Sequence, residues 1–160
     1  MGPWWPAILR EADRRRGSHL EDHLPPESSI EAEEVDILGA AGEYLFALFM
    51  GIELPSPRSG PDPGWDFVID GRRIDVKSRE YLRPDIYLLV PKKEDLRADA
   101  YVLAQIDLRE WGGRLLGWAT RAEVARAQVK SFGYEGYEAR TIAAPTLRSL
   151  EELWPRAAAE

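Results

Sequence analysis

The stretch 64-GWDFVIDGRRIDVKSRE-80 decides the fold of this chain. Asp70 and Gly71 stand between two runs in which apolar and polar residues alternate, and an Asp-Gly pair in that position predicts a two-residue type I′ hairpin turn. With this turn, Phe67 faces Ile74 across the hairpin, and their neighbours two positions away extend one apolar face. We therefore expect a β-hairpin with one face on the core.

The same register places two acidic side chains together on the other face. Asp66 is expected directly opposite Asp75, with Lys77 one step further along that face. Directly opposed residues have Cβ atoms roughly 4.5–5.5 Å apart, and like charges in that position are destabilising. Either Arg73 and Lys77 neutralise the carboxylates on an ordinary solvated face, or a divalent cation lies between them, since Mg²⁺ commonly takes one or two carboxylates with phosphate and water.

Composition indicates one soluble domain. The chain has 160 residues, of which 44% are hydrophobic, so a substantial core can be buried. Cysteine is absent, which excludes disulfides and thiolate zinc sites and fits a reducing compartment. The longest apolar run, 44-YLFALFM-50, is much shorter than the roughly 20 residues of a membrane span. We expect a cytoplasmic protein with no membrane association.

The distribution of charge is uneven. The net charge of −7 counts against strong non-specific binding of nucleic acid, which usually requires a basic surface. Basic residues nevertheless cluster in the hairpin and around the strand that follows it, beside the two aspartates. They are Arg72, Arg73, Lys77, Arg79, Arg83, Lys92 and Lys93.

Residues 1–28 contain four prolines and no sustained periodicity, so we expect an irregular N-terminal arm of at most a helical turn or two before a single domain over 29–160. The adjacent Trp4 and Trp5 indicate that part of the arm docks, and with Trp111 and Trp154 they could close either a core or a dimer. His19 and His23 lack the H-E-x-x-H order, and prolines follow at once. An exposed polar segment is therefore expected there, in preference to a zinc site.

Ser28 and Glu31 form a capping box that predicts a long helix to about Met50, with Gly51 as its stop. The apolar stripe expected on the buried side of this helix consists of Ile30, Ile37, Ala41, Leu45 and Leu48. Glu43 lies off that stripe, and its neighbours at helical spacing are small or apolar. It is either an exposed or amide-bonded residue, or a buried carboxylate that requires a cation or several donors.

The remaining chain predicts an α-β-β-β-α-β order with later additions, which is a mixed sheet flanked by helices. A central strand is expected over 85–91, a short crossover helix over 92–100 and an apolar strand over 101–108. Thr120 and Glu123 form a second capping box, which predicts a helix from Thr120 to about Lys130. The other expected additions are a strand over 114–119, an edge strand over 138–144 and a helix over 146–154.

This order of elements, with an acid on the first helix, an acid on the first hairpin strand and D-x-K on the second, resembles the PD-(D/E)XK nuclease superfamily. The matching residues are Glu43, Asp66 and the tripeptide Asp75-Val76-Lys77, and the resemblance covers roughly the core over 29–108, which leaves 109–160 as C-terminal additions. It implies a restriction endonuclease-like core. It also implies a metal-dependent DNA endonuclease, of the restriction or junction-resolving kind, that acts as a monomer or homodimer.

The resemblance implies roles for these residues. Asp66, Asp75 and the Val76 carbonyl would hold one or two Mg²⁺ or Mn²⁺ ions with Glu43, and Lys77 would orient water or neutralise phosphate. Nucleic-acid phosphates would be contacted by Arg73, Arg79, Lys92 and Lys93, each of which could equally be solvated surface. From another functional class, a catalytically silent module that binds nucleic acid or protein would keep the same fold.

Three features depart from the family pattern. Pro61-Asp62 supplies a literal "PD", but Asp62 precedes the strand, so the metal role falls to Asp66. Asp75 replaces the commoner glutamate and shortens the reach by one methylene. A Q-x-x-x-Y motif is missing, the nearest match being Gln128 to Phe132, which argues against a processive exonuclease.

Overall fold

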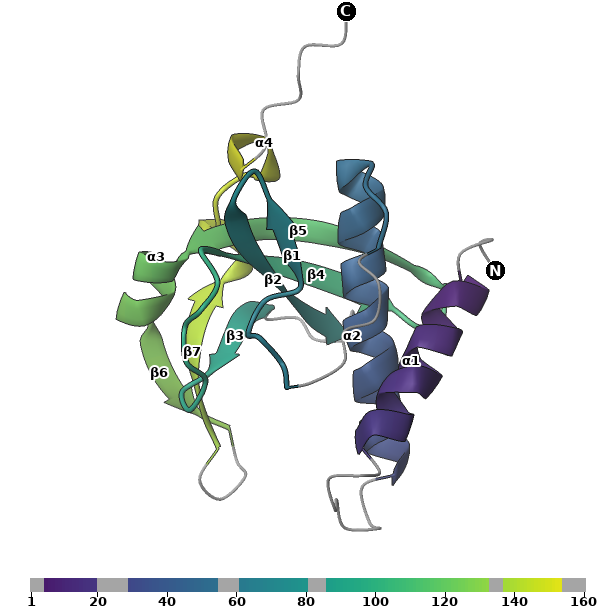
Figure 1. The fold of residues 1–160 in the computed structure, drawn as a ribbon. Helices are drawn as coiled ribbons and strands as arrows, with labels where there is room; N and C mark the ends of the chain where they lie inside the picture. Colours follow the sequence, from purple (N-terminus) through teal and green to yellow (C-terminus); the bar gives the residue numbers. More distant parts are fainter. Residues whose placement is uncertain (1–4, 20–28, 55–60, 81–85, 133–136, 154–160) are drawn as a thin grey trace, which may run out of the picture.

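The computed structural model describes residues 5–19, 29–54, 61–80, 86–132 and 137–153 (Figure 1). They form a four-stranded sheet of order β1-β2-β4-β5 and a three-stranded sheet of order β3-β7-β6. The larger sheet is mixed, since β2 and β4 are parallel and its other pairs are antiparallel. The protein is thus α/β with a mixed sheet and flanking helices, as predicted. Its strands are β1 (Phe67–Ile69), β2 (Arg72–Glu80), β3 (Tyr87–Pro91), β4 (Ala100–Asp107), β5 (Gly112–Thr120), β6 (Gln128–Ser131) and β7 (Glu138–Ala143).

The predicted hairpin is present. Asp70 and Gly71 have φ values of 46° and 76°, as a type I′ turn requires, and Phe67 pairs with Ile74. The pairing of β1 with β2 ends at Phe67 and Ile74, one residue earlier than expected. The N–H of Asp66 donates to the carbonyl of Ile74 at 2.8 Å, so Asp66 is bonded to the residue that already pairs with Phe67. Asp66 therefore lies outside β1 and is not the direct cross-strand partner of Asp75.

β4 separates two cores. Its residues Ala100 and Val102 belong to a core with α2, whereas Tyr101 and Leu103 point to the opposite face and pack with β3 and the short helix α3 (Arg121–Arg126). The strand is buried from Ala100 to Ile106, as the sequence predicts for a central apolar strand.

Helix α2 (Ser29–Met50) packs against β2, β4 and β5. It ends as predicted at Gly51, which has φ 65°, and the hydrogen bonds from Gly51 to Leu48 and from Ile52 to Ala47 complete a Schellman motif. The expected cap at Ser28 lies outside the described residues. Leu48, expected in the buried stripe, is 51% exposed, because the buried face instead includes Phe46 and Ala47.

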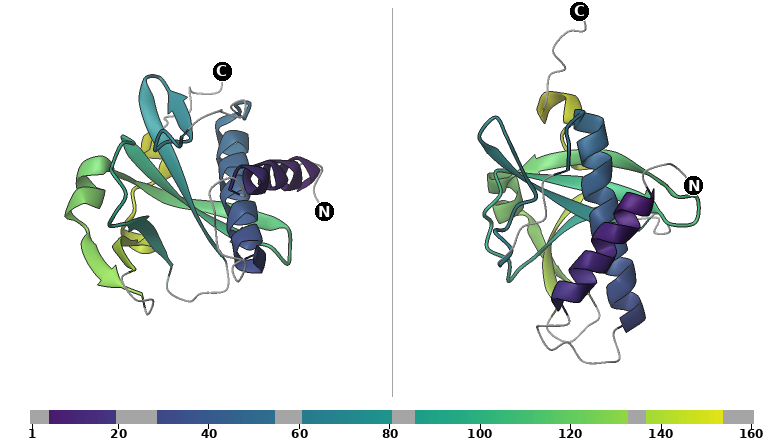
Figure 2. Two further views of the ribbon diagram at one scale, coloured as in Figure 1. Left: turned by 60° about the horizontal axis from the view of Figure 1, so that its bottom comes forward. Right: turned by 45° about the vertical axis from the view of Figure 1, so that its right-hand side comes forward.

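The prediction of an irregular N-terminal arm is wrong over Trp5–His19, which form helix α1 (Figure 1). The helix crosses α2 and packs against it (Figure 2). Trp5 is 1% exposed, lies edge-on to Trp111 with ring centroids 4.3 Å apart, and donates from Nε1 to the Trp111 carbonyl at 2.8 Å. The helix is therefore stabilised by burial, which its weak periodicity did not indicate. Trp4, His23 and Trp154 lie outside the described residues.

The predicted α-β-β-β-α-β order is correct for its strands but wrong at its second helix, since residues 92–99 contain no helix. The strand predicted over 85–91 is present as β3, but it is an edge strand of the second sheet and not a central strand. The backbone groups of residues 92–99 bond elsewhere: the N–H of Lys92 donates to Glu138 and that of Glu94 to Pro91. The parallel crossover from β2 to β4 therefore runs through a strand and a loop.

The C-terminal additions differ in length from the prediction. The capping box of Thr120 and Glu123 is present, but α3 ends at Arg126 because β6 pairs with β7, which lies in the middle of its sheet instead of at the edge. The last helix, α4, covers Leu150–Leu153 within the described residues, and it begins later than predicted because Arg148 forms an extended bridge with Trp118.

Candidate active site

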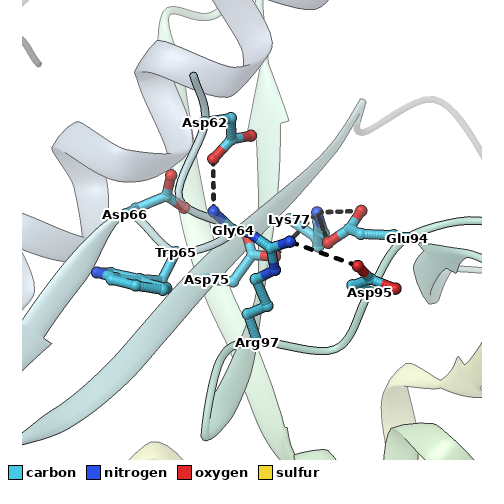
Figure 3. A pocket seen from close by; sticks show the side chains of 9 residues that line it. All are labelled: Asp62, Gly64, Trp65, Asp66, Asp75, Lys77, Glu94, Asp95 and Arg97. Carbon is cyan, nitrogen blue, oxygen red and sulfur yellow. Dashed lines mark hydrogen bonds and ion pairs between the residues drawn. The ribbon is translucent and has the colours of Figure 1, made fainter. Parts of the chain in front are cut away.

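A cavity of about 260 Å³ lies where the hairpin meets the loop after β3 (Figure 3). Five of its lining residues carry carboxylates and two carry cationic groups, so its formal charge is negative. The lining consists of Asp62, Gly64, Trp65, Asp66, Asp75, Lys77, Glu94, Asp95 and Arg97.

Asp66 is held at the open edge of β2. One oxygen of its carboxylate, Oδ2, accepts a hydrogen bond from the Val76 N–H at 2.7 Å, so the side chain continues the hairpin after the backbone ladder has ended. Burial raises the pKa of Asp66 well above its usual value, and the charges of Glu43 and Asp75 raise it further, against the effect of the Val76 hydrogen bond. The structure thus brings these three acids within electrostatic range.

Glu43 nevertheless lies outside the cavity lining. α2 covers the face of β2 that carries Ile74 and Val76, whereas Asp75 and Lys77 alternate with them and point to the other face. Glu43 on α2 therefore acts on the site through its charge, which raises the pKa of Asp66.

Asp75, which is buried, forms a charge cluster with Lys77 and Glu94, which are half-buried. Lys77 Nζ lies 2.9 Å from Asp75 Oδ2, and 2.9 and 3.0 Å from the two carboxylate oxygens of Glu94. Burial raises the pKa of Asp75 to about 6; Lys77 opposes this rise and Glu94 adds to it. Burial acts to lower the pKa of Lys77, but the two carboxylates outweigh it and raise that pKa above its ordinary value. Lys77 is thus held in its charged form.

Sequence reasoning missed Glu94. It lies in the loop after β3, seventeen positions from Lys77, and no strand register or helical spacing links the two residues. The only feature that could have indicated Glu94 is its place among the charged residues of 92-KKEDLRADA-100, for which the sequence predicts a crossover helix.

The predicted phosphate contacts are not part of the cavity lining. Arg73 Nε lies 3.3 Å from Asp99 Oδ2, and its guanidinium lies over the Trp65 ring at 5.3 Å. Lys92 pairs with Glu138 at 2.9 Å. Lys93 is exposed and Arg79 is half-buried. The cavity cation that the sequence did not indicate is Arg97, which approaches Asp95 at 3.4 Å (Figure 3).

Tyr101 lies beneath this cluster, since it pairs with Asp75 in the parallel register of β2 and β4. It is fully buried. Burial raises the pKa of Tyr101 and the charge of Asp75 adds to the rise, whereas a hydrogen bond with the backbone of Ala98 opposes it. The phenol therefore lies within electrostatic range of the acidic cluster.

Within the described ranges, no three His, Cys, Asp or Glu side chains form a group that could hold a metal ion. Comparison of the chain with protein-family models, with curated proteins and with solved structures finds no match. None of the described helices is long and apolar enough to cross a membrane.

Proposed function

We propose that this protein is a metal-dependent nuclease that hydrolyses phosphodiester bonds of DNA, with its site at Asp66, Asp75 and Lys77. The observation that carries the proposal is the cavity at the edge of β2, where Asp75 is buried, Asp66 is half-buried, and both have raised pKa values. Two carboxylates with unfavourable mutual repulsion in a water-accessible cavity are stabilised by a cation.

The donor set fits Mg²⁺ or Mn²⁺ when phosphate and water supply the remaining ligands. Asp66 Oδ2 accepts from the Val76 N–H, and Asp75 Oδ2 is paired with Lys77. Each carboxylate therefore has its second oxygen, Oδ1, as a ligand for the ion. The Val76 carbonyl points to the same edge of β2 as its N–H, because both groups of a strand residue face one neighbour. These three residues would hold the ion, and Glu43 would act from the side of Asp66.

A bound divalent cation supplies the activation of water and the stabilisation of charge that develops on phosphate. Lys77 adds a fixed positive charge at the same place. Since its pKa is raised, Lys77 acts as a charged donor to phosphate or water and not as a general base. In the net reaction an oxygen of water forms a bond to phosphorus, the bond from phosphorus to the leaving oxygen breaks, and that oxygen takes up a proton.

The proposed fold assignment is a restriction endonuclease-like core made of α2, the β1–β2 hairpin and β4. Its support is the parallel pairing of β4 with the strand that carries D-x-K, next to the hairpin partner that precedes it. The crossover without a helix and the second sheet are departures from that core.

Nuclease assays on supercoiled, linear, branched and single-stranded DNA, with Mg²⁺, Mn²⁺ or EDTA, test the proposal. We expect metal-dependent cleavage that Asp75→Ala abolishes. The matched control is Asp70→Asn, which removes a carboxylate from the exposed hairpin turn and is compatible with its positive φ. Cleavage that Asp75→Ala leaves unchanged would refute the assignment of the site.

A catalytically silent binding module is the second candidate. It is favoured by the lack of a three-acid metal group among the described residues and by the saturation of Lys77 with two carboxylates. Thermal unfolding with and without Mn²⁺ distinguishes the two, because a cation that binds the folded state raises the melting temperature. No rise and no cleavage would support the silent module.

A further inference from the structure

We propose that Glu94 occupies the place on Lys77 that a substrate phosphate takes, and thereby sets the affinity of the site for nucleic acid. This inference rests on the proposed nuclease function and adds a residue to it. Glu94 would be a positioning residue, displaced from Lys77 when the phosphate binds.

The first support is the geometry of the Lys77 ammonium group. A lysine has three N–H donors. Its three contacts are Asp75 Oδ2 at 2.9 Å and the two Glu94 oxygens at 2.9 and 3.0 Å. Glu94 thus supplies two of the three oxygens around the ammonium group, and a phosphate can take the place of these two only if Glu94 leaves.

The two carboxylates differ in how easily they can leave. Asp75 lies within β2 and its side chain is 9% exposed, whereas that of Glu94 is 26% exposed and lies on a loop. The backbone of Glu94 is anchored independently, since its N–H donates to Pro91 and its carbonyl accepts from Arg140. Rotation of the Glu94 side chain would then free Lys77 without moving the loop.

The exchange of Glu94 for phosphate preserves the hydrogen bonds of Lys77. A phosphate diester offers two anionic oxygens in place of the two carboxylate oxygens, so Lys77 keeps its hydrogen bonds. Removal of Glu94 from the cavity also removes one negative charge that would repel the phosphate. In the free protein, Glu94 therefore lowers the affinity for nucleic acid.

The test measures binding in EDTA at low salt, where cleavage does not interfere, by fluorescence anisotropy of a labelled single-stranded DNA oligonucleotide. We expect Glu94→Gln to tighten binding about fivefold, the size of one partly exposed charge pair. The matched control is Asp95→Asn, which removes the same charge from the same cavity but not from Lys77. It should tighten binding by a clearly smaller factor.

A double-mutant cycle with Lys77→Gln isolates the contact. In that background Glu94→Gln should have no effect beyond that of Asp95→Asn. Equal effects of the two single variants, weaker binding by Glu94→Gln, or no binding by any variant would overturn the inference. If Glu94→Gln fails to fold, Glu94→Asp replaces it, with a smaller change expected in the same direction.

Cleavage assays and Mn²⁺ melting shifts of the same variants separate this inference from the proposed function. A Lys77-dependent gain in binding without cleavage by any form would contradict the nuclease but not the competition at Lys77. Loss of the Mn²⁺ shift in Glu94→Gln would make Glu94 a metal ligand, and the inference would then be wrong.

Discussion

The Asp66 carboxylate accepts a hydrogen bond from the Val76 backbone N–H at 2.7 Å. A side chain thus takes the place of a backbone partner at the point where β1 has ended and β2 continues. The carboxylate is positioned by β2 itself, and it stays beside Asp75 although the two residues are not cross-strand partners.

Asp66→Asn should retain this hydrogen bond through its amide oxygen while it removes the charge. Because burial and neighbouring acids disfavour that charge, we expect a higher melting temperature than wild type in EDTA at pH 7, and loss of both cleavage and Mn²⁺ stabilisation. Asp66→Ala leaves the Val76 N–H without this acceptor and should be about 1–3 kcal/mol less stable than Asp66→Asn. Urea unfolding measures the difference. Equal stability of the two variants would contradict a structural role for the hydrogen bond.

The pKa of Asp75 predicts a pH dependence. It rises from an ordinary value of 3.8 to about 6 in the folded protein, so folding favours the protonated form. Stability from this group is complete below pH 3.8, falls as the pH rises toward 6, and is constant above. The melting temperature of Asp75→Asn minus that of wild type, in EDTA, should therefore increase from pH 4 to 6 and then level off. A flat difference across this range would show that Asp75 is not perturbed.

Arg73 and Lys93 should respond differently to substitution by alanine. Arg73 bonds Asp99 through both its side chain and its N–H and lies over Trp65, so we expect Arg73→Ala to lower stability by about 1 kcal/mol. Lys93 is exposed, and Lys93→Ala should leave stability unchanged. If Lys93 contacts phosphate, its loss should reduce the salt dependence of DNA binding by about one unit of slope. An unchanged slope would assign Lys93 to the solvated surface.

Gly42 lies where α2 packs tightly against β2. A Cβ at this position would lie 1.9 Å from Ser78 Oγ and 3.2 Å from the Cβ atoms of Ser78 and Ala104. We expect Gly42→Ala to destabilise the protein by about 1–2 kcal/mol, although alanine is the better helix former. Ser78→Ala removes the nearest atom and should recover part of the loss, as measured by urea unfolding. Stabilisation by Gly42→Ala alone would contradict this tight packing.

The sequence predicted well those features that depend on neighbouring residues. The Asp70-Gly71 turn, the Gly51 helix stop and the Thr120-Glu123 capping box each follow from local backbone chemistry, and all three are present. The strand β4 could also be predicted from the sequence, because a central strand that is buried on both faces consists largely of apolar residues.

The sequence did not predict those features that depend on contacts between distant parts of the chain. The position of β3 in the second sheet depends on its pairing with β7, about fifty residues away, for which no local pattern exists. Glu94 reaches Lys77 only because of that arrangement. Of the predicted site, Asp66, Asp75 and Lys77 meet at one cavity. Glu43, Val76 and the four predicted phosphate contacts lie outside its lining.

The contact between Trp5 and Trp111 has a consequence for the synthesis of the chain. The two residues are 106 positions apart, so α1 emerges from the ribosome long before its partner exists. At about 5–20 residues per second, Trp5 must therefore wait several seconds for the β4–β5 turn to be synthesised. The packing of α1 on α2 can form early, whereas the ring contact and hydrogen bond of Trp5 with Trp111 can form only late in synthesis.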